Sequence, residues 1–77
     1  MNVGILLFNE VEVLDFAGPF EVFSICSNAE QKKLFNVFTV SEHAQISARN
    51  GLQITSHYTL DTAPHIDILV IPGGLGA

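Results

Sequence analysis

The side chains of this 77-residue chain that could take part in catalysis follow two apolar segments. Asp15 closes an acidic stretch after residues 3–8, and Gly73 and Gly74 come after residues 68–71. A carboxyl group can act as a general acid or base or orient a nucleophile. Glycine N–H groups can approach a ligand with no Cβ in the way. A carboxyl that faces two amide donors suits acyl-transfer or carbonyl chemistry, with the amides as an oxyanion hole.

Each of these residues also has a structural interpretation that the sequence leaves open. Asp15 could cap a helix, and Gly73 and Gly74 could form no more than a sharp turn between a strand and a helix. Glu10 and Glu12, in the same acidic stretch, are expected to be solvated loop charges. The glycine pair lacks both the G-x-G-x-x-G pattern and a P-loop lysine, so the sequence gives little support to nucleotide binding.

The cysteine and the histidines do not predict a second site. Cys26 comes late in a predicted helix, far from the helix N-terminus where catalytic thiols are commonly activated, so we expect a small core residue. His43, His57 and His65 lack metal-ligand spacing and are expected on the surface, so neither a metal nor a cofactor is predicted. A single cysteine allows no internal disulfide and is typical of a reducing compartment, which predicts a cytoplasmic location.

The elements that would position Asp15 and the glycines form an α/β fold with a parallel sheet. Residues 3–8 and 67–71 predict two strands, because residues 3–8 and, after Asp67, residues 68–71 are unbroken apolar runs, typical of strands buried on both faces. Residues 35–40, rich in Phe, Val and Thr, predict another strand. In such a sheet, ligands bind outside the carboxyl ends of the strands where the strand order reverses. If residues 3–8 lie centrally, segments 9–15 and 72–76 reach that point together.

One helix is predicted between the first two strands. We expect residues 9–15 to stay extended and the helix to open at Gly18 and Pro19, with Gly18 as its cap and Pro19 at its first position. Three phenylalanines at helical spacing should pack on the sheet: Phe16, Phe20 and Phe23.

Asn50 and Gly51 predict a β-hairpin. A two-residue loop would scatter the apolar side chains over both faces of the ribbon. A three-residue loop, 49–51, pairs Ile46 with Ile54 and gathers apolar side chains on one face. We therefore expect the longer loop, with Gly51 in the left-handed region.

Composition and charge exclude several classes of protein. Apolar residues make up 48% of the chain and charged residues 14%, which excludes intrinsic disorder. The net charge of −5 argues against a nucleic-acid surface on this segment. The longest apolar stretches fall far short of the roughly 18 residues that a membrane span needs, and no basic segment precedes the first of them as in a signal peptide.

The elements expected here cannot bury both faces of their sheet. Parallel strands with one long helix would leave residues 3–8 and 68–71 exposed to water on one side. We therefore expect residues 1–77 to be the N-terminal portion of a single larger domain, truncated after the Pro-Gly-Gly turn. Dimerisation could cover part of this surface.

With these segments laid out, the sequence resembles the DJ-1/PfpI family of the class I glutamine amidotransferase-like superfamily. The most specific match is Leu-Asp-Phe-Ala-Gly-Pro-Phe-Glu-Val-Phe at residues 14–23, and residues 3–8, 35–40, 50–54 and 67–74 match as well. The resemblance is greatest to the branch that contains isonitrile hydratase-like proteins and the N-terminal ligand-binding domains of certain AraC-type regulators.

The resemblance implies a flavodoxin-like three-layer sandwich, usually a homodimer, with a site for a small molecule. By motif position, Asp15 would be the acid that hydrogen-bonds a nucleophilic cysteine on a strained elbow between strand and helix. Gly73 and Gly74 would supply backbone N–H donors near that cysteine. The family's cysteine follows a further helix and strand, which places it beyond Ala77, so residues 1–77 alone are expected to be catalytically inactive.

Two functions stay open at this point. The parent protein could be a cysteine-dependent enzyme that adds water to a small molecule, as isonitrile hydratase-like proteins do. It could instead be a non-catalytic, ligand-sensing domain joined to a C-terminal helix-turn-helix domain, as in AraC-type regulators. Neither function requires nucleic-acid or membrane contact by this segment, and neither implies a cofactor.

Overall fold

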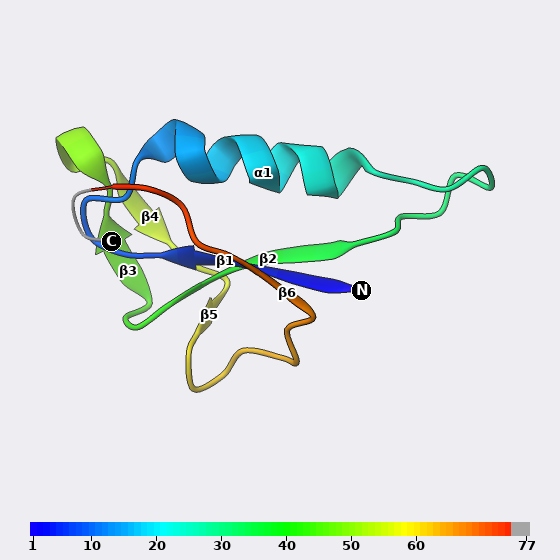
Figure 1. Ribbon diagram of the computed structural model, residues 1–77. Helices are drawn as coiled ribbons and strands as arrows, with labels where there is room; N and C mark the ends of the chain where they lie inside the picture. The colour runs from blue at the N-terminus through cyan, green and yellow to red at the C-terminus, as the bar shows by residue number, and fades with distance from the viewer. Residues whose placement is uncertain (75–77) are drawn as a thin grey trace.

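The computed structural model describes residues 1–74 and shows one helix lying over a mixed set of strands (Figure 1). Residues 75–77, which include the end of the predicted segment 72–76, lie outside the described residues. The elements are, in order, β1 (Asn2–Leu7), α1 (Val13–Ile25), β2 (Asn36–Ser41), β3 (Gln45–Ser47), the 3₁₀ turn η1 (Arg49–Gly51), β4 (Gln53–Thr55), β5 (Tyr58–Thr59) and β6 (Ile68–Val70). The predicted α/β class is confirmed.

Four parallel strands form the main sheet in the order β5-β2-β1-β6, while β3 and β4 form a separate antiparallel pair. The register of β1 on β2 runs from Asn2↔Asn36 to Leu7↔Ser41, and β6 pairs with the middle of β1 on its other side. The expected central position of the first strand is therefore confirmed. Because parallel strands end at the same edge of a sheet, the segments after β1 and β6 emerge side by side.

The face of the sheet under α1 carries the core. Val3, Ile5 and Leu7 of β1 are buried, and Phe16 and Phe20 of α1 pack against the core cluster that contains Ile5 and Leu7. This confirms the predicted phenylalanine stripe, which Phe23 extends by an edge-on contact with the ring of Phe35 at 5.0 Å between centroids.

The opposite face of the sheet is covered in part. Phe38 and Val40 of β2 are buried, and a Cβ on Gly4 of β1 would lie 2.9 Å from the side chain of Ile66. The expectation that the whole first strand stays exposed on one side is therefore wrong, because the chain before β6 folds back beneath it. On this face, exposed apolar side chains lie on the edge strand β6 and on the segment that follows it, where Leu69 is 50% exposed and Ile71 65%.

The predicted start of the helix is wrong. α1 begins at Val13 instead of Gly18, so Asp15 lies in its first turn and Pro19 is inside the helix. Glu12, at the N-cap position, makes no side-chain cap hydrogen bond. The start of α1 is set by tertiary pairing, because the Glu12 N–H donates to the Gly73 carbonyl at 3.0 Å. Local signals could not show that contact, and the 13-residue helix tolerates its proline at the cost of one backbone hydrogen bond.

The hairpin has the predicted register. Ile46 pairs with Ile54 across β3 and β4, and the loop consists of the three residues of η1. Gly51 has φ +83°, as expected for the left-handed region. Within residues 1–74, no helix is both long enough and apolar enough to cross a membrane.

Candidate functional site

The structure brings Asp15 and the Pro-Gly-Gly turn together at the carboxyl edge of the sheet. A Cβ built on Gly73 would lie 2.8 Å from Oδ2 of Asp15, so the carboxylate oxygen rests directly against the glycine backbone. Asp15 is exposed, and among residues 1–74 its carboxylate makes no hydrogen bond or ion pair. The two segments that the sequence placed at one edge are therefore in contact, with the carboxylate open to solvent.

Gly74 lies equally close to the segment after β1, but against backbone. A Cβ at this position would meet the carbonyl oxygen of Glu10 at 2.6 Å and the Cα of Val11 at 2.9 Å, and the φ of Gly74 is +150°. Val11 and Gly74 form an isolated antiparallel bridge. Only glycine fits this backbone conformation and this distance.

Backbone amides complete the arrangement. The Gly73 carbonyl accepts the Glu12 N–H, whereas the N–H groups of Gly73 and Gly74 donate to no partner within residues 1–74. The N–H of Asp15 donates to the Glu12 carbonyl at 3.1 Å in the first turn of α1, where the helix dipole favours a negative charge. A carboxylate can move a proton, and amide donors without a partner among residues 1–74 can stabilise a developing oxyanion beside it.

Glu12 does not lie free in solvent as the sequence predicted. Its Oε2 lies 3.5 Å from Nε of Arg49, with both side chains nearly half exposed, and this oxygen is shielded from water without a hydrogen bond. The Arg49 N–H also donates to the Val11 carbonyl at 3.1 Å. These contacts tie η1 to the segment that carries Asp15. Glu10 is exposed, as predicted.

Two named proteins resemble the chain in sequence. Isonitrile hydratase from Pseudomonas putida is 26% identical over 76 residues, which cover 99% of this chain and 31% of that protein. The HTH-type transcriptional regulator GbdR from Pseudomonas aeruginosa is 29% identical over 76 residues, covering 97% of this chain and 21% of the regulator. The chain thus spans less than a third of the length of these curated relatives. No family model matches it.

Solved structures decide the fold. A ThiJ/PfpI family protein from Pseudomonas syringae superposes with a TM-score of 0.75 at 23% identity, over 95% of this chain and 28% of that one. The chain has the DJ-1/PfpI fold. The DJ-1 superfamily protein Atu0886 from Agrobacterium tumefaciens gives 0.66 at 22% identity over 97% of this chain and 38% of its own. An AraC family transcriptional regulator from Pseudomonas putida superposes with a TM-score of 0.68 at 19% identity, over 96% of this chain and 47% of the regulator chain.

Cys26 cannot serve the edge of this DJ-1/PfpI fold where Asp15 lies. It follows Ile25, the last residue of α1, and the ten helical residues between it and Asp15 place it about 16 Å farther along the helix axis. Its thiol donates to the Val22 carbonyl at 3.2 Å, and it is half-buried instead of forming part of the core as predicted. Among residues 1–74, no three side chains able to ligate a metal come together.

The sequence analysis did not predict that the His57 side chain is held in place by hydrogen bonds. His57 was expected to be an ordinary surface histidine, and its side chain is exposed, but it is held by Thr39 of β2. The Thr39 N–H donates to Nδ1 of His57 at 2.9 Å, and the His57 N–H donates to Oγ1 of Thr39 at 2.9 Å. No local pattern links a residue of β2 with one 18 positions later, in the short segment between β4 and β5.

Proposed function

We propose that residues 1–77 form the N-terminal part of a DJ-1/PfpI-type domain that acts on a small molecule. In this proposal Asp15 is the acid, and Gly73 and Gly74 supply the backbone donors. The observation that carries the proposal is the contact between the Asp15 carboxylate and Gly73 at the carboxyl edge of the sheet. The similarity to isonitrile hydratase over 99% of this chain supports it.

The nucleophile in this proposal is a thiol from polypeptide after residue 77, since Cys26 lies at the far end of α1. The chemistry would be hydration of an isonitrile. The thiolate adds to the terminal carbon while a proton is delivered to that carbon, which gives a thioimidate. Water then adds, the thiolate leaves, and an N-substituted formamide is released. Asp15 would transfer the protons, and the amides of Gly73 and Gly74 would stabilise the negative charge.

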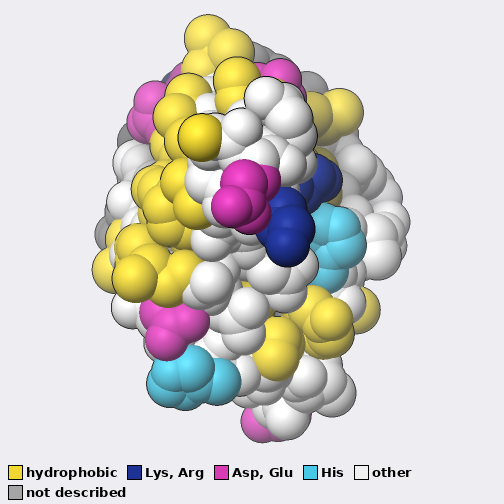
Figure 2. Space-filling model, turned by 90° about the vertical axis from the view of Figure 1, so that its right-hand side faces the viewer, with side chains coloured by type: hydrophobic (Ala, Val, Ile, Leu, Met, Phe, Trp, Pro, Cys, Tyr) yellow, Lys and Arg dark blue, Asp and Glu magenta, His cyan; other side chains and the backbone are white. Residues whose placement is uncertain are grey.

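Exposed apolar side chains support the proposal that further protein covers this segment, as another part of the domain or as a second copy in a homodimer. α1 is apolar on its outer side as well as its inner one, with Leu14 81%, Val22 58% and Ile25 68% exposed. Figure 2 shows hydrophobic side chains running from the top of the molecule, where α1 lies, down one side. A helix that is apolar all round is typical of a buried position.

Substitution of Asp15 in the protein expressed from its complete gene tests the proposed activity. Asp15→Asn removes the proton-transferring carboxyl and keeps the shape, so hydration of a simple isonitrile should fall at least 100-fold, as is common when a general acid or base is lost. Glu30→Gln, which neutralises an exposed loop carboxylate, is the control and should turn over normally. Unchanged turnover in Asp15→Asn would refute the assignment.

The second candidate is a ligand-sensing domain of an AraC-type regulator, a function favoured by the 29% identity to GbdR. In that case the site binds an effector without converting it, and DNA contacts come from a different, basic domain. Promoter binding by the complete protein, with no product formed from an isonitrile, would establish this function. Formamide production without DNA binding would exclude it. A single cysteine suits either function in the cytoplasm, which we propose as the location.

A further inference from the structure

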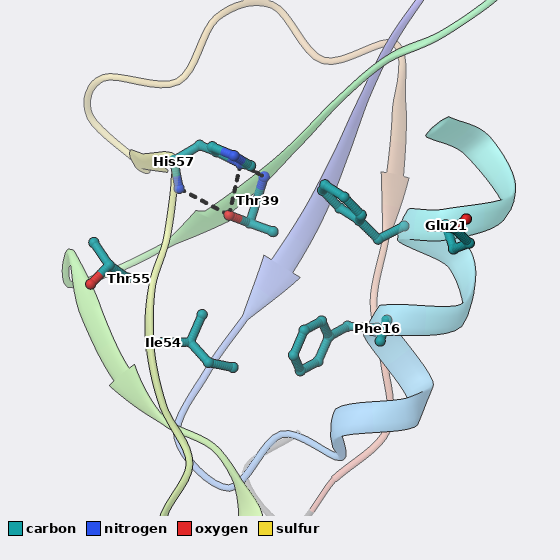
Figure 3. A pocket seen from close by; sticks show the side chains of 8 residues that line it. Phe16, Glu21, Thr39, Ile54, Thr55 and His57 are labelled. Carbon is teal, nitrogen blue, oxygen red and sulfur yellow. Dashed lines mark hydrogen bonds between the residues drawn. The ribbon is translucent and has the colours of Figure 1, made fainter. Parts of the chain in front are cut away.

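A cavity of about 370 Å³ that is open to solvent on one side lies between the inner face of α1 and the strands β2 and β4 (Figure 3). Its size falls in the range of small-molecule sites, about 300–1,000 Å³. The side chains that matter for recognition are Phe16, Phe20, Glu21, Thr39, Ile54 and His57. Asp15, Gly73 and Gly74 do not line it, so it is separate from the candidate site at the edge of the sheet.

His57, one of the cavity-lining residues, has a ring whose tautomer is fixed by a hydrogen bond. The Thr39 N–H donates to Nδ1 of His57, so Nδ1 must be unprotonated, and the proton of the neutral imidazole is on Nε2. Thr39 itself is buried. Nε2 has no hydrogen-bond partner within residues 1–74. The pair therefore presents one oriented N–H that the fold of this segment does not use.

The walls of the cavity are flat and apolar. The ring of Phe20 stacks on the ring of His57, with centroids 6.2 Å apart and an interplanar angle of 15°. Figure 3 shows Phe16 and Ile54 pointing toward one another from opposite sides. Aromatic and branched side chains in this arrangement favour a planar ring, because stacking adds to the area that is buried.

The charges around the cavity limit its ligand further. Glu21 is the charged residue among the cavity-lining side chains, and it is exposed. Since no Lys or Arg among residues 1–74 lines the cavity, an anionic ligand would meet a negative charge without a compensating cation from this part of the chain. The lining favours a neutral molecule.

We propose that this cavity binds a neutral, planar heteroaromatic molecule whose ring nitrogen or carbonyl accepts the Nε2–H of His57. The ring lies between Phe16 and Ile54 beside the stacked pair of Phe20 and His57. This is a binding site additional to the proposed reaction site, and it does not depend on Asp15.

Two probes of the same shape test the hydrogen bond. Benzimidazole offers an acceptor nitrogen, and indole replaces that nitrogen with carbon. In titrations of the protein from its complete gene, followed by ¹H–¹⁵N NMR at mildly alkaline pH where both probes are neutral, benzimidazole should shift the amide signals of Thr39, Ile54 and His57. Indole should bind about fivefold to tenfold more weakly, the effect of one hydrogen bond. Equal affinity for the two probes would overturn the role of His57.

Matched variants in β4 test the location. Ile54→Trp fills the cavity, whereas Gln53→Trp adds the same side chain on the exposed side of the strand. Ile54→Trp should lower benzimidazole affinity at least tenfold and Gln53→Trp should leave it unchanged. Equal binding by both variants would refute the location of the site. If the parent protein does not bind benzimidazole, the proposal is wrong. Dissociation of an oligomer by Ile54→Trp in sedimentation would then show that the cavity is a contact between copies of the chain.

A variant that weakens the hydrogen bonding between Thr39 and His57 gives an independent readout. Thr39→Val removes the Oγ1 that accepts the His57 backbone N–H and that lies 3.1 Å from Nδ1. The bond from the Thr39 N–H to Nδ1 remains as the single hydrogen bond that holds the ring, so the ring should be less firmly oriented. The ¹⁵N signal of Nε2 should then broaden, and benzimidazole affinity should fall while indole affinity changes little. A parallel fall for both probes would show that Thr39 only shapes the cavity and that no oriented donor exists.

Discussion

The carboxylate of Asp15 touches the backbone of Gly73 so closely that any Cβ at residue 73 would come within 2.8 Å of Oδ2. The contact joins the first turn of α1 to the end of the chain segment after β6. It exists because β1 and β6 are neighbouring parallel strands whose ends share one edge. The same distance makes Gly73 a sensitive point for testing the site without removing the carboxyl group.

Gly73→Ala should reduce the proposed hydration activity and leave the fold nearly intact. The new methyl group meets the far end of a flexible side chain, so Asp15 can swing away, and stability should change by less than about 0.5 kcal/mol. The displaced carboxylate would no longer face the amides, and turnover by the complete protein should fall at least tenfold. Steady-state kinetics and thermal melts measure the two effects. Full activity in Gly73→Ala would show that the position of Asp15 does not matter.

Gly74→Ala should instead lower the stability of the fold. Here the methyl group would meet backbone atoms of Glu10, Val11 and Glu12 at 2.6–3.0 Å, which cannot move without breaking the bridge to Val11. The φ of +150° adds strain for any residue with a Cβ. We expect a loss of about 2–3 kcal/mol in the free energy of unfolding, measured by denaturant titration with Gly73→Ala as the control. Equal stability of the two variants would contradict this backbone argument.

The parts of the fold that could be predicted are those that leave a pattern of apolar and polar residues within a short stretch of the sequence. Unbroken apolar runs predicted the buried parallel strands, and alternation on the two sides of the hairpin predicted the pairing of Ile46 with Ile54. The meeting of the segments that carry Asp15 and Gly73 was expected from the rule for parallel sheets, on the condition that the first strand lies centrally, and the strand order meets that condition.

Features that depend on contacts between distant residues could not be predicted. The helix begins at Val13 because the segment after β1 is held by Gly73 and Gly74 across the edge of the sheet, whereas local signals pointed to Gly18 and Pro19. His57 was interpreted as a surface residue for the same reason. Its role depends on Thr39, which is 18 residues away and comes within hydrogen-bonding distance only in the folded sheet.

Ionisation of Asp67, at the amino-terminal end of the sheet, should make the free energy of unfolding depend on pH in the acid range. The Asn2 N–H donates to Oδ2 of Asp67 at 2.7 Å, and this bond is the largest cause of a lowered pKa of Asp67, helped by the hydrogen bond and charge of His65 and opposed by desolvation. Because the folded pKa lies below the ordinary value of 3.8, ionised Asp67 stabilises the fold above that value. This contribution is lost as the pH falls through the folded pKa.

Asp67→Asn tests this linkage. The variant should be less stable than the parent at neutral pH, and the difference should shrink as the pH falls below 3.8. Urea titrations across that range measure it, with Asp61→Asn, an exposed turn carboxylate, as the control. A difference that is constant with pH would show that the Asp67 charge does not contribute.

Two glycines with open space around them should respond to alanine with opposite signs. In the part of the chain that the structure describes, an added Cβ at Gly18 or Gly51 would have no atom within 4 Å apart from the neighbouring residues and the backbone of the same helix, so the backbone conformation decides the effect. Gly51 has φ +83°, and alanine there should cost about 1 kcal/mol. Gly18 lies inside α1, where alanine should stabilise by about 0.5–1 kcal/mol. Denaturant titrations give both values. If Gly18→Ala destabilises the complete protein while Gly51→Ala behaves as expected, another surface must pack against α1 at that glycine, between the exposed side chains of Leu14 and Val22.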